Sequence, residues 1–160
     1  MANIDSVVVA HPDFGEIIVT AHNARTLSDE EWEANYLRYV RDMKRRGKLN
    51  EGANLVFAEG KGPSSVQRSA GNAIFGKEEE YTFRVSVITT SWMVRGAVTA
   101  ISWFNPQIRA FSPGDWMRAY HHVRVTEAHY RVIRQAVEVL DQKVANVAVL
   151  KHYLAGTYAA

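Results

Sequence analysis

The densest set of potential metal ligands in this sequence is formed by His121, His122, Glu127 and His129. Neighbouring residues on a helix point about 100° apart, so His121 and His122 cannot easily share one ion unless the chain breaks beside them. Thr126 is a typical helix cap and predicts such a break, which could bring His129 back toward the pair. The spacing does not match HExxH or another zinc pattern. We therefore predict no metal site, and histidines that face solvent or a partner.

The sequence contains no signature of a catalytic nucleophile. It has no cysteine, which excludes thiol chemistry, disulfides and cysteine-based zinc or iron–sulfur sites. No GxSxG turn presents a serine. The carboxylates of Glu78, Glu79 and Glu80 form a run that is most simply a solvated loop. The expectation is a protein that is not an enzyme and that has no cofactor.

The segment GKGPSS at residues 60–65 invites comparison with a phosphate-binding loop, because glycines and a lysine precede a helix start. It lacks the GxxxxGK[ST] spacing, so a Walker-type site is not expected. The free amides and the dipole of a helix N-terminus still favour an anion or a nucleotide, and an ordinary loop is the alternative. The candidate ligand- or partner-binding residues here are Lys61, Ser64, Ser65, Arg68 and Ser69.

Composition indicates one globular domain, with 160 residues of which 47% are hydrophobic and 22% charged. A net charge of +2 is too small to indicate nucleic-acid binding. The N-terminus has no basic region like that of a secretory signal, and no apolar run reaches the roughly 20 residues of a transmembrane helix. We therefore expect a cytoplasmic protein with no membrane or nucleic-acid partner. One basic cluster reads as a solvated face or as a docking patch for an acidic partner: Arg38, Arg41, Lys44, Arg45, Arg46 and Lys48.

Predicted strands and helices alternate along the chain. Short apolar runs between turn residues predict strands at 4–10, 16–21, 53–58, 81–90 and 107–111. Caps and apolar spacing predict helices from the Ser28–Glu31 capping box to Gly47, from Pro63 through Phe75, over 93–104 and over 116–122. The valines of 93–104 would also suit a strand, but its apolar stripe favours a helix.

This order of elements predicts an α/β fold. Strands that alternate with helices form a mainly parallel sheet, here of about five strands with helices on its flanks. The opening hairpin adds one antiparallel pair, so the sheet is mixed. Right-handed crossovers give the simplest topology.

The C-terminal segment 124–160 is predicted to be a helical extension of a domain at 1–123. A helix from Thr126 to Leu154 would be about 44 Å long, although a kink near Ala145–Asn146 is an alternative. Its apolar residues repeat at alternating steps of three and four, as in a coiled coil. The stripe either packs on the sheet of the same chain or buries against a second subunit. The predicted homodimer interface consists of Tyr130, Ile133, Val137, Leu140, Val144 and Val147.

The chain from about residue 4 to 123 resembles the STAS domain, and within it the SpoIIAA-like branch related to bacterial anti-sigma-factor antagonists. The segments that carry this resemblance are LSDEEW at 27–32, PSSVQR at 63–68 and VRGAVTAISWFNPQIRAF at 94–111. The resemblance implies a non-enzymatic module that binds protein partners, and some members bind nucleotides. Phospho-switch members carry a pattern like Asp-Ser-Ser-Gly at the start of the second helix. The nearest match here is Arg68-Ser69-Ala70-Gly71, which puts Ala70 at the phospho-acceptor position.

The leading functional hypothesis is therefore a regulatory or scaffolding module in bacterial signalling that works through protein–protein contacts and self-associates through its C-terminal helix. The alternative is a sensor of a small anion or nucleotide that uses the helix start at residues 61–69. A ligand that co-purifies would favour the sensor, and a stoichiometric protein partner would favour the scaffold.

Overall fold

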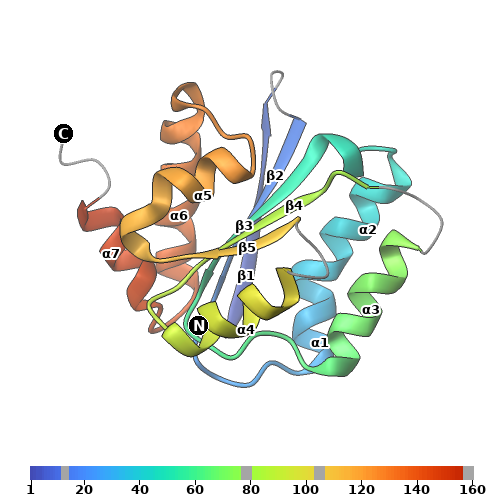
Figure 1. Cartoon of the computed structure of the whole chain (residues 1–160), viewed down its shortest axis with the longest axis horizontal. Helices are drawn as coiled ribbons and strands as arrows, with labels where there is room; N and C mark the ends of the chain where they lie inside the picture. Colours follow the sequence, from blue (N-terminus) through green and yellow to red (C-terminus); the bar gives the residue numbers. More distant parts are fainter. Residues whose placement is uncertain (12–14, 77–80, 103–106, 157–160) are drawn as a thin grey trace.

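Five strands form one sheet in the order β1-β2-β3-β4-β5 (Figure 1). The computed structural model describes residues 1–11, 15–76, 81–102 and 107–156. The strands are β1 (Ile4–His11), β2 (Gly15–His22), β3 (Gly52–Ala58), β4 (Arg84–Ile88) and β5 (Ile108–Phe111). β1 is antiparallel to β2, and the other neighbouring pairs are parallel. The predicted mixed, mostly parallel five-stranded sheet is thus confirmed.

Helices cover both faces of this sheet (Figure 1). Between β2 and β3 the chain forms α1 (Asp29–Trp32), a π-helical turn (Glu33–Leu37) and α2 (Arg38–Arg45). The connections on either side of β4 contain α3 (Ser65–Phe75) and α4 (Trp92–Ser102). After β5 follow α5 (Trp116–His122), α6 (Tyr130–Lys143) and α7 (Ala148–Gly156). None of the helices in the described ranges is both long and apolar enough to cross a bilayer.

Alternation along the strands divides the apolar residues between two cores. Val19, Leu55 and Phe57 point to the face that α5, α6 and α7 cover. Ile18, between two residues of that core, points instead to the face covered by the α1–α2 segment and α3, where Leu37 and Met43 meet it. Each face of the sheet therefore packs against its own set of helices and forms a separate apolar core.

The first helix begins where the sequence predicts. The backbone N–H of Glu31 donates to Ser28 Oγ (3.1 Å), and the N–H of Ser28 donates to the Glu31 carboxylate (2.9 Å). The predicted continuous α-helix is instead interrupted by the π-helical turn, which contains Tyr36. Burial raises the pKa of Tyr36 to about 12, and its hydroxyl hydrogen-bonds with Asn54 on β3. The π-helical turn therefore occurs where Tyr36 makes a polar contact with β3.

The helix predicted over 93–104 is confirmed as α4, and residues 103–106 at its end lie outside the described part of the chain. α4 starts one residue earlier, at Trp92, whose side chain is exposed. β4 is shorter than the predicted strand at 81–90, because the chain before Arg84 joins the α2–α3 face through Phe83 instead of the sheet.

The C-terminal segment is two helices and not one. The chain breaks between α6 and α7, where Asn146 has a left-handed φ of 58° and Val144 is extended. This is the predicted alternative of a kink near Ala145–Asn146. Because the chain turns back there, both helices lie on the same sheet face, and the described part of 124–160 packs on the body of the same chain.

This packing corrects the predicted oligomer interface. Five of its six residues are fully or almost fully buried within the single chain and belong to the core between the sheet, α5, α6 and α7: Ile133, Val137, Leu140, Val144 and Val147. Tyr130 is partly buried, and its ring packs edge-on against Trp116 and Tyr120 at centroid distances of 5.5 and 5.1 Å. The repeat that suggested a second subunit is the pattern needed to cover this chain's own sheet.

Candidate functional site

The predicted helix-start residues lie at the beginning of α3 but do not converge on a cavity. Ser64 is the N-cap: its Oγ accepts from the N–H of Gln67 (3.2 Å), and Gln67 Oε1 accepts from the N–H of Ser64 (2.9 Å). Arg68 donates to the carbonyl of Pro63 (2.8 Å). Lys61, Ser65 and Ser69 are exposed. Two of the five residues thus stabilise the helix start, and a ligand at this place stays a prediction.

The match to the phospho-switch pattern falls in the wrong turn of the helix. α3 begins at Ser65, so Ser69 and Ala70 lie in its second turn and not at its N-terminus. The hydroxyls at the N-terminus are those of Ser64 and Ser65. Ala70 instead faces a groove between α3 and the first helix.

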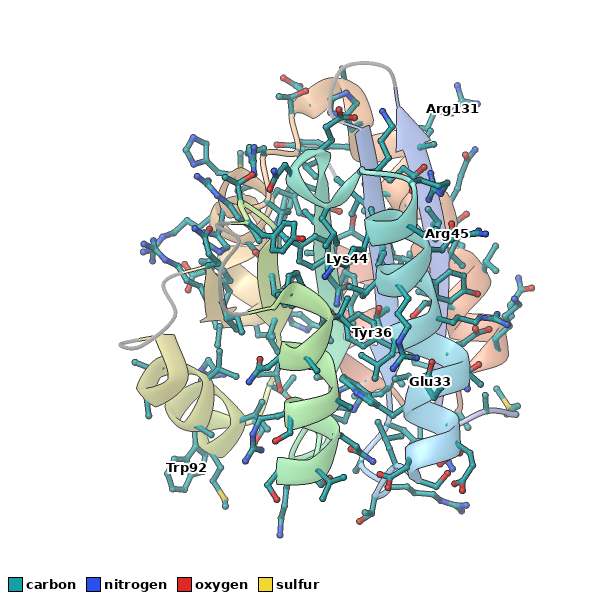
Figure 2. All side chains as sticks on the ribbon, turned by 90° about the vertical axis from the view of Figure 1, so that its right-hand side faces the viewer. Glu33, Tyr36, Lys44, Arg45, Trp92 and Arg131 are labelled. Carbon is teal, nitrogen blue, oxygen red and sulfur yellow. The ribbon has the colours of Figure 1, made fainter. Side chains whose placement is uncertain are left out.

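This groove, which we call the α1–α3 groove, has a volume of about 340 Å³. Its apolar lining comes from Trp32 and Leu37 on the first helix and from Val66 and Ala70 on α3, while Gln67 lies between them. Figures 1 and 2 show the two helices side by side on this face of the sheet. Val66 is 65% exposed, so the α3 side of the groove presents an aliphatic side chain to solvent.

Carboxylates line the first-helix side of the groove. Asp29 accepts from Gln67 Nε2 (3.0 Å), a contact across the groove, and Glu33 pairs with Arg41. Glu30 is fully exposed, and hydrogen bonds from its own backbone N–H and from Ser28 hold its pKa below the ordinary value. The rim is therefore negatively charged at neutral pH, with Glu30 and Asp29 facing no cation among the described residues that line the groove.

The floor of the groove also carries a hydrogen-bond donor. Trp32 Nε1 is buried and has no partner among the described residues. Its ring lies 4.6 Å from the ring of Tyr36. A buried indole N–H is normally hydrogen-bonded, so this donor lacks the partner expected for it in the described part of the chain.

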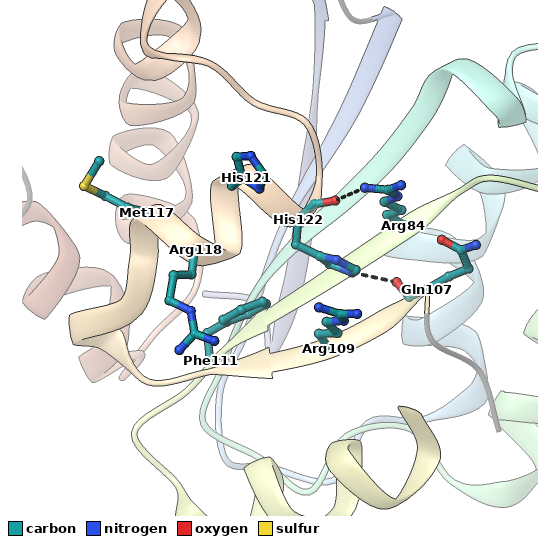
Figure 3. A pocket seen from close by; sticks show the side chains of 8 residues that line it. All are labelled: Arg84, Gln107, Arg109, Phe111, Met117, Arg118, His121 and His122. Carbon is teal, nitrogen blue, oxygen red and sulfur yellow. Dashed lines mark hydrogen bonds between the residues drawn. The ribbon is translucent and has the colours of Figure 1, made fainter. Parts of the chain in front are cut away.

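A second cavity lies on the opposite face, between α5 and the β4–β5 edge of the sheet (Figure 3). We call it the basic pocket. Its volume is about 610 Å³, and its lining joins residues from β4, β5 and α5: Arg84, Gln107, Arg109, Phe111, Met117, Arg118, His121 and His122.

Backbone geometry fixes the inner wall of the basic pocket. Because Ser86 on β4 is opposite Arg109 on β5, and side chains alternate along strands, Arg84 and Arg109 both point to the α5 face. Arg84 Nη1 donates to the carbonyl of His122 (3.1 Å), and His122 Nε2 donates to the carbonyl of Gln107 (3.0 Å), as Figure 3 shows. The first bond ties the end of α5 to β4, and the second holds the imidazole against the chain just before β5.

The electrostatics of the basic pocket are one-sided. The described residues of its lining include three arginines and two histidines but no carboxylate. Burial lowers the pKa of His122, and the charges of Arg109 and Arg84 lower it further, against the opposing hydrogen bond to Gln107. Burial and the neighbouring charge of Arg84 also lower the pKa of Arg124. Positive charge at this place is therefore not compensated from within the lining.

The four potential metal ligands do not come together. His121 and His122 line the basic pocket. His129 is buried, and its Nδ1 accepts from the N–H of Thr126 (3.2 Å) at the cap of the next helix. Across the described ranges, no three histidine, aspartate or glutamate side chains are grouped as metal ligands.

The basic side chains at the end of the first helix form ion pairs and hydrogen bonds with other groups of the same chain. Arg41 pairs with Glu33, Arg46 with Glu16 and Lys48 with Glu51, and Lys44 donates to the carbonyl of Ile74. Arg38 donates to Tyr39 (2.7 Å), and Arg45 pairs with Asp42. These contacts favour the interpretation of the cluster as a solvated face over that of a docking patch for an acidic partner.

Sequence reasoning missed both cavities. A signal for the basic pocket was present, because Arg84 and Arg109 interrupt apolar strand segments in YTFRVSV and PQIRAF. Their meeting depends on the pairing of β4 with β5 and on the position of α5, which no local pattern contains.

Comparison with known proteins gives no match: no family model, no curated protein and no solved structure is similar to this chain.

Proposed function

We propose that this chain is a non-catalytic, STAS-like regulatory module that binds a protein partner in the α1–α3 groove. The partner segment is a basic amphipathic helix. The observation that carries this proposal is the combination of an apolar floor, an exposed Val66 and a carboxylate rim in one groove. The resemblance to partner-binding STAS domains supports the same class of function.

The shape of the groove favours a helix as the guest. Two roughly parallel helices leave a channel between them, and such channels take the apolar face of a third helix with anchors at positions i and i+4. A volume of about 340 Å³ is enough for one or two large aliphatic or aromatic anchors. Val66 and Ala70 are themselves four residues apart, so they present one continuous stripe to the guest.

The charge on the rim selects a basic guest. Asp29, Glu30 and Glu33 line one side of the groove, whereas the α3 side is neutral at Val66, Gln67 and Ala70. Lysine or arginine residues beside the apolar stripe of the guest would meet Asp29 and Glu30, whereas Glu33 is already paired with Arg41. Such pairs are exposed, so they contribute more to orientation and association rate than to affinity.

A selection from a displayed library of helical peptides tests this proposal. The enriched sequences are expected to combine an apolar stripe with lysine or arginine on its flank. An enriched peptide is then synthesised, and its affinity is measured by fluorescence anisotropy. Enrichment of acidic or featureless peptides, or no enrichment, would show that the groove is not a site for basic helices.

Matched variants locate the binding. Val66→Asp adds charge to the floor and should weaken binding of the selected peptide about tenfold or more, as expected for losing one buried aliphatic contact. Val139→Asp is the control, because Val139 is also exposed but lies on α6, on the other face of the sheet. Equal affinity of Val66→Asp and the unmodified protein would contradict the proposal.

Self-association stays a prediction. If the chain forms a homodimer, the contact uses a surface other than the buried residues between Ile133 and Val147, because these cover its own sheet.

A further inference from the structure

We propose that the basic pocket binds a nucleotide-sized organic phosphate, with the phosphate groups held by Arg84, Arg109 and Arg118. This site lies on the face of the sheet opposite the α1–α3 groove, so it does not depend on the function proposed for that groove. It also differs in place from the helix start at residues 61–69, where the sequence suggested an anion.

Three guanidinium groups reach the pocket from three different elements. Arg84 begins β4, Arg109 lies in β5 and Arg118 lies in the first turn of α5. A guanidinium carries five N–H donors in a planar fork that fits phosphate oxygens in pairs. The bond from Arg84 to the carbonyl of His122 uses one of these donors and leaves the group able to bind an anion.

No carboxylate among the described lining residues accounts for the presence of three arginines at this place. Arg84 and Arg109 form no ion pair with a carboxylate in the described part of the chain, and no carboxylate lines the pocket. Arg118 is largely exposed and lies 3.8 Å from Asp115 outside the lining. Cationic groups at one place without counter-charge repel one another, and an anion with several negative charges removes that repulsion.

The size and the remaining lining indicate more than inorganic phosphate. A volume of about 610 Å³ is within the range of small-molecule sites and far exceeds one phosphate group. Phe111 and the exposed Met117 add apolar surface beside the arginines. Such a combination suits a ligand with a phosphate part and a ring that can pack on an aromatic or thioether side chain.

Isothermal titration calorimetry of the full chain with four probes tests the inference: ATP, inorganic tripolyphosphate, adenosine and a single-stranded oligonucleotide. ATP should bind most tightly, tripolyphosphate more weakly, and adenosine without measurable heat. If the oligonucleotide binds more tightly than ATP, the surface serves nucleic acid and the inference is wrong. If none of the probes binds at physiological ionic strength, the inference is wrong as well.

Variants separate a built site from general attraction of anions. Arg109→Gln should lower ATP affinity about tenfold or more, the size expected for a charge-assisted contact. Arg131→Gln is the control, since Arg131 is exposed on α6 and is labelled in Figure 2. Because Arg109 is exposed, its variant should keep the unmodified melting temperature without ligand. An equal loss of affinity in both variants would mean that ATP responds only to net charge, which would overturn the inference.

Discussion

The carboxylate of Glu59 accepts a hydrogen bond from the backbone N–H of Val149 at 2.7 Å, across 90 positions of sequence. Glu59 follows β3, and Val149 lies in the first turn of α7. Thr90, after β4, donates to the other carboxylate oxygen (3.2 Å). One side chain therefore connects the ends of two central strands to the N-terminus of the last helix, where the helix dipole also favours its charge.

Replacing Glu59 should loosen α7 from the sheet. Glu59→Ala removes the acceptor for Val149 and should lower the free energy of unfolding by about 1–2 kcal/mol, measured by urea denaturation. Glu59→Gln keeps an acceptor without the charge and should lose less. The control is Glu138→Ala, which removes an exposed i,i+4 pair with Arg134 and should cost under about 0.5 kcal/mol. Equal effects of the two alanine variants would contradict a role for Glu59 in holding α7.

A chain that ends after Arg124 should not fold. It lacks 10 of the 21 described buried residues of one core, most of them in α6 and α7, so the sheet face made by Val19, Leu55 and Phe57 would be open to water. The expected result is the loss of a cooperative thermal transition in circular dichroism. A chain that ends after Gly156 keeps every described residue and serves as the control. A sharp transition in the shorter chain would show that residues 1–124 form a domain of their own.

A row of polar side chains crosses the sheet under the π-helical turn. The hydroxyls of Ser6 and Thr20 lie 3.0 Å apart, and Thr20 donates to Asn54 Oδ1 (3.1 Å). The side chain of Asn54 also hydrogen-bonds with Tyr36. Asn54→Val leaves the hydroxyls of Thr20 and Tyr36 without this partner and should cost about 1–3 kcal/mol in unfolding free energy.

The control for the polar row is Ser69→Ala, an exposed change that should be nearly neutral in the same urea titration. If Asn54→Val is as stable as the unmodified protein, the row is dispensable and the valine fills its place without loss.

Stability should depend on pH through His22. Burial lowers the pKa of His22 below its ordinary value of 6.5, and the hydrogen bond to Asn23 and the charge of Glu59 only partly oppose this. The unfolded chain therefore gains a proton near pH 6.5 that the folded chain does not accept. The free energy of unfolding should fall as the pH drops below about 6.5, until the folded imidazole is also protonated.

Urea titrations between pH 5.5 and 7.5 check this dependence. His22→Gln should show a flatter pH profile, whereas His152→Gln, at an exposed position on α7, should keep the slope of the unmodified protein. Because burial also lowers the pKa of His122, part of the slope should survive in His22→Gln. An unchanged slope in His22→Gln would exclude His22 as its source.

Local patterns were sufficient for most of the fold. The Ser28–Glu31 capping box, the helix end at Phe75 and the strand at 53–58 each follow from neighbours in sequence, and each lies where the sequence predicts it. The π-helical turn has no such signal, since it accompanies the long-range contact of Tyr36 with Asn54. The C-terminal repeat predicts either a cover for the chain's own sheet or a dimer interface, because an apolar stripe looks the same in both cases. The structure shows the first, so the predicted interface residues are wrong.

The two cavities could not be read from sequence for a related reason. The basic pocket joins Arg84, Arg109 and Arg118, and the distance between them depends on strand pairing and on the path of α5. The α1–α3 groove depends on the distance between two helices on the sheet. That distance is set by the volumes of the side chains packed beneath the helices, which no local sequence pattern shows. The helix start at 61–69 is visible in the sequence because it is a local motif. In the structure the Ser64 hydroxyl and the Arg68 guanidinium bind the backbone of this helix start.

The segment at the start of β1 is bonded to the end of α6. The N–H of Ala2 donates to the carbonyl of Lys143 (3.0 Å), Ala2 is bridged to Val144, and Lys143 Nζ lies 3.3 Å from the carboxylate of Asp5. A ribosome makes β1 well before the helix that covers it, because α6 follows all five strands in the sequence. In the nascent chain the sheet residues of that face therefore wait for their cover, and this layer can assemble only after α6 has left the ribosome.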